Sequence, residues 1–255
     1  MFDTHAHLNF PNYNKDRKKV IKKCLDRGIF VVNVGTSYKE SKEVINIANS
    51  YNDGIYASVG LHPLYIEEGF NYNKYKKLAQ QKKVVAIGET GLDYKYIKNK
   101  KKRENIAKKQ EVIFREHIRL AEEVNIPLIL HCRMAHKQLL FALKEEMSKG
   151  KRIKGVLHCF SSNLKEAKEC LNLGLYVGIN GIIFKMNLDK IIKEIPLERV
   201  VLETDCPFLS PISDIKRNEP LFLNIIAKKI AEIKEESLEK VIEVTTKNAK
   251  SLFEI

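Results

Sequence analysis

The chain has 255 residues, of which 44% are hydrophobic and 30% are charged, and no run of 18 or more apolar residues interrupts it. These values exclude a membrane-spanning helix and are typical of a globular protein with the size of one α/β barrel. The formal net charge of +13 favours a polyanionic partner such as nucleic acid, although lysines spread evenly over the surface would give the same total.

Short β-branched runs alternate with longer helical patterns along the whole chain, which is typical of a parallel sheet built from βα units. The runs predict eight strands near residues 1–5, 29–35, 55–60, 84–89, 127–131, 155–158, 175–179 and 200–204. We therefore expect an α/β fold, a (β/α)8 TIM-type barrel that forms a single domain over residues 1–255.

The clearest helical pattern runs from about residue 104 to 124, where apolar residues recur at spacings of three and four, and Pro127 ends it. Two further amphipathic stretches, about 219–233 and from Ser237 onward, predict helices after the last strand. The second of these is the expected C-terminal helix. Ser237 should cap it, but Lys240 stands where a capping box needs Glu or Gln.

Four of the seven histidines, one glutamate and one aspartate stand at or just past the ends of predicted strands. Each alone has a simpler interpretation, because a single histidine is usually structural and an acidic residue can cap the following helix. Together, at one end of a barrel, they indicate ligands for two divalent cations. The residues are His5, His7, Glu89, His131, His158 and Asp205, with Glu89 as the bridge.

Two cations about 3.5 to 4 Å apart lower the pKa of a shared water and stabilise both the attacking and the leaving oxygen of a hydrolysis. The ligand set therefore predicts a metallohydrolase. Imidazole-rich sites favour Zn²⁺, whereas phosphodiester cleavage often uses Mg²⁺ or Mn²⁺. We expect Mg²⁺ to be the ion in action.

Five cysteines without a CxxC spacing argue against a disulfide framework and, with a beginning unlike a secretory signal, predict a cytoplasmic location. Cys132, Cys159 and Cys206 each directly follow a proposed ligand. Thiolate ligation or nucleophilic catalysis is therefore one interpretation. Packed thiols are the other, and they are favoured because neighbours along a strand point to opposite faces.

A dense basic segment at residues 95–103, Lys-Tyr-Ile-Lys-Asn-Lys-Lys-Lys-Arg, follows the fourth predicted strand. In an α/β barrel the loops after the strands carry the active site, so this segment is expected on the catalytic face. Lys100, Lys101 and Arg103 would contact phosphates there. A solvated loop without function is the alternative.

Taken in order, the motifs resemble the TatD-type metal-dependent deoxyribonuclease family within the amidohydrolase-like barrels, and the match spans nearly the whole chain. The matching segments are Asp3-Thr-His-Ala-His-Leu8, Val59-Gly-Leu-His-Pro63, Ile87-Gly-Glu-Thr-Gly-Leu-Asp93, Leu130-His-Cys-Arg133, His158-Cys-Phe-Ser161, Leu202-Glu-Thr-Asp-Cys-Pro207, Lys216-Arg-Asn-Glu-Pro220 and Thr246-Lys-Asn-Ala249. The resemblance implies a TIM-like barrel with two divalent cations that hydrolyses DNA phosphodiesters as an endonuclease or a 3′-to-5′ exonuclease. It also implies that His5, His7 and Asp205 hold one ion and His131 and His158 the other, with Glu89 between them.

One segment departs from the family pattern. The family usually reads His-Ser-Arg-Asp-Ala where this chain has His131-Cys-Arg-Met-Ala135. Met134 therefore replaces an acidic residue that would pair with Arg133. Arg133 therefore loses this partner, whereas metal ligation is unaffected.

The expected reaction places the scissile phosphate across both ions, where a water activated by the two metals attacks in line and Asp205 takes up or relays its proton. His62 would protonate the leaving oxygen or bind a neighbouring phosphate, unless it only stabilises its turn. Asp93 and Glu203 are expected to orient ligands. The predicted catalytic residues are Asp205, His62 and Glu89, and the predicted substrate-binding residues are His62, Arg133, Arg217, Asn218, Lys100, Lys101 and Arg103.

Two other functions remain open. The same dinuclear barrel hydrolyses C–N and C–O bonds, so an amidohydrolase-type deacylase or esterase, including an aminoacyl-tRNA deacylase, is the first. A non-catalytic barrel that binds nucleic acid through its lysines is the second. The basic segment and the net charge favour a nuclease that acts on DNA and has no membrane partner.

Overall fold

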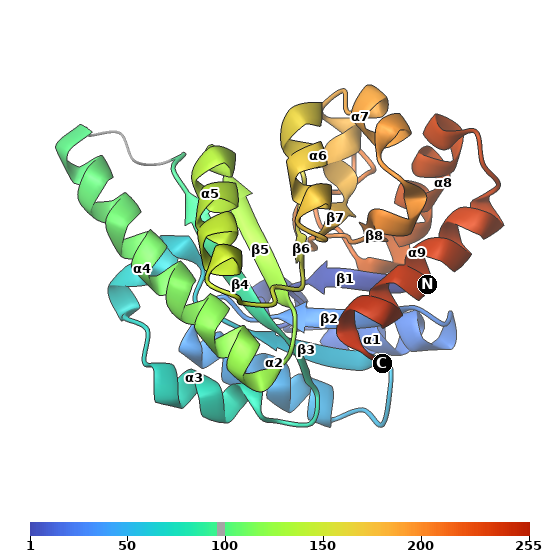
Figure 1. The fold of residues 1–255 in the computed structure, drawn as a ribbon. Helices are drawn as coiled ribbons and strands as arrows, with labels where there is room; N and C mark the ends of the chain where they lie inside the picture. The colour runs from blue at the N-terminus through green and yellow to red at the C-terminus, as the bar shows by residue number, and fades with distance from the viewer. Residues whose placement is uncertain (96–99) are drawn as a thin grey trace.

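The computed structural model describes residues 1–95 and 100–255, without the side chains of residues 100–103. In this part of the chain, eight parallel strands form one sheet in the order β1 to β8, and helices surround it (Figure 1). The strands are β1 Phe2–Ala6, β2 Phe30–Val34, β3 Ile55–Val59, β4 Val84–Asp93, β5 Leu128–Arg133, β6 Gly155–Leu157, β7 Tyr176–Ile179 and β8 Val200–Leu202. The predicted TIM-type fold is confirmed.

The first and last strands close the sheet into a barrel. Ala6 forms a parallel bridge with Cys206, and the His7 backbone N–H donates to the Cys206 carbonyl at 2.8 Å. The Asp205 N–H donates to the His5 carbonyl, also at 2.8 Å. Closure therefore takes place at the residues that carry three of the predicted ligands.

The helices along the chain are α1 Arg17–Asp26, α2 Tyr38–Asn49, α3 Tyr72–Ala79, α4 Lys100–Val124, α5 His136–Ser148, α6 Leu164–Asn172, α7 Asp189–Glu194, α8 Leu223–Lys234 and α9 Leu238–Phe253. Short 3₁₀ turns include η2 Pro63–Glu68 and η3 Gly181–Phe184. The expected cap of α9 is confirmed, because Ser237 Oγ accepts the Lys240 N–H at 3.1 Å. The basic segment was predicted as a loop through residue 103, which is wrong at its end, because α4 already begins at Lys100.

The amino-terminal end of the barrel is closed by side chains. Phe2, Val32 and Val201 belong to one buried cluster with Leu252 and Phe253 of α9. The rings of Phe2 and Phe253 stack with centroids 6.0 Å apart. Because these side chains fill the interior at this end, the site is expected at the carboxyl ends of the strands.

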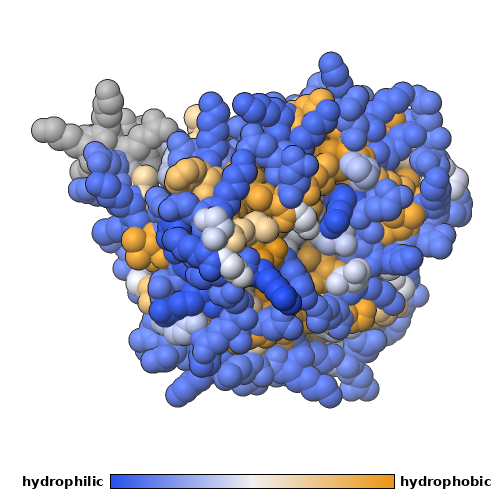
Figure 2. All heavy atoms as spheres, in the orientation of Figure 1, coloured by the Kyte–Doolittle hydropathy of each residue, from blue (hydrophilic) through white to orange (hydrophobic). Residues whose placement is uncertain are grey.

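The outer surface is predominantly hydrophilic, with some hydrophobic side chains exposed between the charged ones on the face in view (Figure 2). Among the described helices, none combines the length and the apolar character that crossing a bilayer requires.

Candidate metal centre

The six predicted ligands come together at the carboxyl ends of the strands. His5 and His7 come from the end of β1, Glu89 from β4 and His131 from β5, whereas His158 and Asp205 directly follow β6 and β8. All except His5 line one pocket with a volume of about 590 Å³. Their convergence was predicted, whereas their role as ligands stays a prediction.

Glu89 lies between two groups of histidines. Its Oε2 atom is 3.5 Å from His5 Nε2 and 3.7 Å from His7 Nε2. Its Oε1 atom is 2.7 Å from His131 Nδ1 and 3.2 Å from His158 Nε2. The two carboxylate oxygens therefore face different imidazole groups, which is the arrangement that a bridging ligand requires.

Asp205 completes the first group. Its Oδ1 atom lies 3.5 Å from His7 Nε2 and 3.8 Å from His5 Nε2, and the two Nε2 atoms are 3.1 Å apart. Ligand atoms around a tetrahedral ion with bonds of about 2.0 to 2.1 Å are separated by about 3.3 Å. The donor atoms thus have the spacing and the chemistry that a divalent cation needs.

Hydrogen bonds on the outer ring nitrogens determine which inner nitrogens carry a lone pair. His7 Nδ1–H donates to the Val34 carbonyl at 2.8 Å, and His158 Nδ1–H donates to Glu203 Oε1 at 3.2 Å. In the neutral imidazole the opposite nitrogen, Nε2, is then unprotonated. Both Nε2 atoms face Glu89, so both rings are prepared to bind a cation.

His131 and His62 differ in this respect, although their inner nitrogens are only 3.3 Å apart. His131 Nε2–H donates to Asp93 Oδ2 at 3.1 Å, which leaves a lone pair on Nδ1. His62 Nδ1 instead accepts the Leu64 N–H at 3.1 Å, so its inward Nε2 carries the proton in the neutral ring. We therefore regard His62 as a hydrogen-bond donor and not as a metal ligand, although its position would allow ligation.

The carboxylates and histidines of the centre stabilise each other's charged forms. Burial alone would raise the pKa of Glu89, but the attraction of His158 and the hydrogen bonds with His131 and His158 hold that pKa well below its usual range. Burial would lower the pKa of His158, but Glu203 and Glu89 raise it well above its ordinary value. Positive charge is stabilised at the point where cations would bind.

Glu203 has a more defined position than the sequence indicated. It is fully buried, and its Oε1 atom accepts the Cys159 N–H at 2.7 Å and the Asn180 amide at 2.9 Å in addition to His158. The carboxylate thereby sets the orientation of the His158 ring and of the loop after β6. Asn180 was missed by sequence reasoning, because its partner lies 23 residues away and no local pattern reports the contact.

Asp3 was also missed. Its side chain is buried and accepts hydrogen bonds from the Thr204 N–H and Oγ1 at 2.9 and 2.6 Å and from the His5 N–H at 3.2 Å. These bonds join the start of β1 to the loop after β8. The period of two along β1 places Asp3 on the same face as His5 and His7, and that signal would have identified it.

Two predicted phosphate contacts have other partners in the fold. Arg217 forms a bidentate ion pair with Asp16, with both contacts at 2.8 Å, and a further bond of 2.6 Å to Glu219. Asn218 is buried, and its amide donates to the Thr204 carbonyl at 2.8 Å. Neither residue lines the pocket. Both anchor the loop that follows β8, and their contact with a substrate stays a prediction that this geometry does not favour.

The remaining predicted phosphate contacts are Arg133 and three basic residues at the start of α4. Arg133 lines the pocket, next to Met134, which is 67% exposed and has a positive φ of 56°. Lys100, Lys101 and Arg103 belong to the first turn of α4, but their side chains lie outside the described part of the chain. Their role stays a prediction.

Two of the three cysteines beside the ligands, Cys132 and Cys159, also line the pocket. Burial raises the pKa of Cys132, and it raises the pKa of Cys159 to about 12. Such thiols are protonated and poor nucleophiles at neutral pH. Among the described residues, none of the groups with metal-ligand spacing contains a cysteine. The packed-thiol interpretation is therefore favoured.

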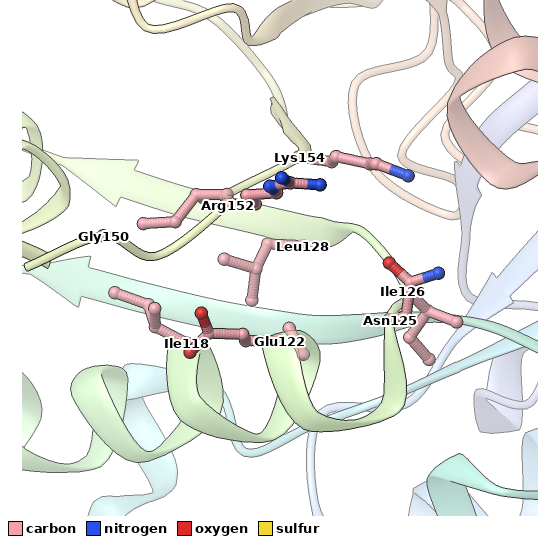
Figure 3. Close-up of a pocket in the computed structure, with 10 residues that line it drawn as sticks. Ile118, Glu122, Asn125, Ile126, Leu128, Gly150, Arg152 and Lys154 are labelled. Carbon is pink, nitrogen blue, oxygen red and sulfur yellow. The ribbon is translucent and has the colours of Figure 1, made fainter. Parts of the chain in front are cut away.

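A second, smaller pocket of about 200 Å³ lies at the other end of β5 (Figure 3). Glu122 and Asn125 near the end of α4, Leu128 at the start of β5, and Arg152 and Lys154 before β6 line it. Among the described residues that line it, there is no histidine or cysteine and only one carboxylate. It is therefore not a candidate metal site.

Comparisons with known proteins agree with this geometry. A family model described as TatD related DNase matches residues 2–254. The uncharacterized metal-dependent hydrolase YabD of Bacillus subtilis is 39% identical over 264 residues, covering 100% of this chain and 99% of that protein. The 3′-5′ ssDNA/RNA exonuclease TatD of Pantoea ananatis is 34% identical over 265 residues, covering 99% of each. The solved structure of YJJV, a TatD homologue from Escherichia coli, has a TM-score of 0.88 at 26% identity, covering 100% of this chain and 98% of that one.

Proposed function

The chain belongs to the TatD related DNase family, and we propose that it is a metal-dependent hydrolase that cleaves phosphodiester bonds of DNA with two divalent cations. The observation that carries this proposal is the position of Glu89, whose two oxygens face separate groups of histidines. Related proteins named as a metal-dependent hydrolase and as a 3′-5′ exonuclease support the reaction class. The product pattern of an end-labelled oligonucleotide will show whether cleavage is endonucleolytic or proceeds from the 3′ end.

Glu89 would be the ligand common to both ions. When bound, the ions would supply a lowered water pKa and charge stabilisation for the phosphate. Mg²⁺ is the proposed ion in action, with Zn²⁺ and Mn²⁺ as alternatives because four imidazoles take part. The first ion would be held by His5, His7 and Asp205, and the second by His131 and His158.

Asp205 is the proposed proton acceptor. Its side chain is 14% exposed, compared with 5% for Glu89, so it is the carboxylate more open to the pocket. Burial raises the pKa of Asp205, but the hydrogen bond with His7 and the neighbouring histidines lower it below its ordinary value. The carboxylate is therefore ionised at neutral pH and able to accept a proton from the attacking water.

His62 is proposed to hold the phosphate. Burial lowers its pKa to about 3, so the ring is neutral at neutral pH and is not a source of protons for the leaving oxygen. Its inward Nε2–H can donate a hydrogen bond to a phosphate oxygen. Of the two roles predicted for His62, the geometry supports phosphate binding.

The test is the product pattern from an end-labelled single-stranded oligonucleotide incubated with Mg²⁺, Mn²⁺, Zn²⁺ or no metal. We expect metal-dependent cleavage, and we expect Asp205→Asn to reduce the rate by about 10²- to 10⁴-fold. Asp53→Asn is the matched control, because Asp53 is an exposed carboxylate that accepts a hydrogen bond from the Tyr56 hydroxyl and lies outside the pocket. Its rate should equal that of the wild type.

The same incubations with charged tRNA and with an ester panel in place of the oligonucleotide distinguish the other functions. Hydrolysis confined to an ester panel or to charged tRNA would reject the nuclease in favour of a deacylase. DNA that both the wild type and Asp205→Asn bind but leave intact would identify a non-catalytic binder.

A further inference from the structure

The pocket above the candidate metal centre has walls that the proposed hydrolysis does not use. Large apolar side chains line them and remain exposed, with relative exposures of 45% for Leu64, 46% for Tyr65, 41% for Met186 and 52% for Phe208. Apart from the histidines, Arg133 is the one cationic side chain among the described lining residues. Such walls complement flat apolar groups better than a bare series of phosphates.

Phe208 is presented to the pocket from an anchored backbone. Its N–H donates to the Asp205 carbonyl at 2.9 Å, and its own carbonyl accepts the Asn218 amide at 2.7 Å. Its ring is nearly perpendicular to that of Phe10, at 6.0 Å, and lies 6.3 Å from that of His7. Half of the ring is nevertheless exposed, so Phe208 offers a rigid apolar surface beside the first ligand group.

Tyr65 lies on the other side, beside the second ligand group, which is His131 and His158. Its N–H donates to the His62 carbonyl at 2.8 Å, and its ring centroid is 6.0 Å from that of His62. His62 in turn is next to His131. Because the two ligand groups lie on different sides of Glu89, the two exposed rings flank the place proposed for the phosphate.

We propose that Phe208 and Tyr65 are stacking surfaces for the two bases that flank the scissile phosphate. The inference rests on the proposed function, because it takes a phosphodiester at Glu89 as its starting point. Such a phosphodiester carries one nucleoside on each side, and every base presents a flat π-face that stacks on an aromatic ring. Recognition is then through unpaired bases, independent of their sequence.

Binding tests this proposal separately from cleavage. Two fluorescent single-stranded oligonucleotides of equal length are compared by anisotropy with the metal-loaded protein, one with bases and one made of abasic sugars. Both carry phosphorothioate linkages that resist hydrolysis. We expect Phe208→Ala and Tyr65→Ala each to weaken binding of the oligonucleotide with bases by about 5- to 100-fold, with no change for the abasic one.

Three further variants separate stacking from general apolar contact. Phe208→Trp should retain the affinity and Phe208→Leu should lose it, because leucine keeps the apolar volume without a flat face. Phe141→Ala is the matched control, since Phe141 is 63% exposed on α5 but does not line the pocket. Three results would overturn the proposal. These are an equal loss of affinity for both oligonucleotides, full affinity in Phe208→Leu, and unchanged affinity in both alanine variants. Absence of cleavage with base-dependent binding intact would refute the proposed function alone.

Discussion

A buried histidine in α4 makes the stability of the fold depend on pH. His117 is fully buried, its Nδ1–H donates to the Ile113 carbonyl at 2.7 Å, and its Nε2 accepts the Leu61 N–H at 3.0 Å. Both ring nitrogens are satisfied only in the neutral form, and the second bond holds the loop that carries His62. A proton on Nε2 would face the Leu61 N–H and break that bond.

The magnitude follows from the pKa. Burial lowers the pKa of His117 from 6.5 to about 4 in the folded chain. The unfolded chain therefore binds the proton first, so the contribution is fully present above pH 6.5 and is lost as the pH falls from there toward 4. At about 1.4 kcal/mol per pKa unit, the whole loss is about 3 kcal/mol, of which about 2 kcal/mol should appear between pH 7 and pH 5.

Urea unfolding of the metal-free protein at a series of pH values provides the assay, with His117→Gln as the matched variant. Glutamine offers an acceptor to the Leu61 N–H but does not titrate in this range. The wild type should lose about 2 kcal/mol more than the variant between pH 7 and pH 5. Parallel pH profiles for the two proteins would show that His117 does not cause the loss of stability.

Three other substitutions test the site and the contacts that hold it. Gly91 has a φ of +144°, and Gly91→Ala would place a Cβ 2.0 Å from a carbonyl oxygen of β5. We therefore expect it to lower the free energy of unfolding by about 2 kcal/mol or more. Gly28→Ala is its control, with an expected loss of about 1 kcal/mol, because its Cβ would meet no atom within 4 Å. Glu203→Gln should weaken metal binding about 10- to 100-fold in calorimetry, and an unchanged affinity would remove its positioning role. Arg217→Met should lower the unfolding midpoint and leave the KM for DNA unchanged. A raised KM at full stability would show instead that Arg217 contacts the substrate.

The barrel and the position of its centre could be predicted because they depend on local signals. Each strand is a short β-branched run, and His131 or Asp205 is recognised as a candidate from its place at a strand end alone. Parallel topology then brings all carboxyl ends to one face without any knowledge of side-chain packing. The six candidate ligands therefore converge as expected.

The surroundings of the centre could not be predicted, because they depend on contacts between distant segments. Arg217 looked free for a phosphate, but its partner Asp16 lies 201 residues away on the chain. The role of His62 depends on a single N–H from Leu64, a detail of the turn geometry that composition does not report. Exposure of Phe208, an apolar residue that sequence reasoning would place inside, is likewise a property of the assembled loop.

If Glu89 joins two cations, the protein should bind two ions per chain, and the metal content reports this number. Chelator-treated protein is reloaded with Zn²⁺ or Mn²⁺, dialysed and measured for metal by mass spectrometry, beside Glu89→Gln and the Asp53→Asn control. We expect two ions per chain in the wild type and in the control, and a loss of both high-affinity sites in Glu89→Gln. One ion or none in the wild type, or two ions retained in Glu89→Gln, would contradict this role of Glu89.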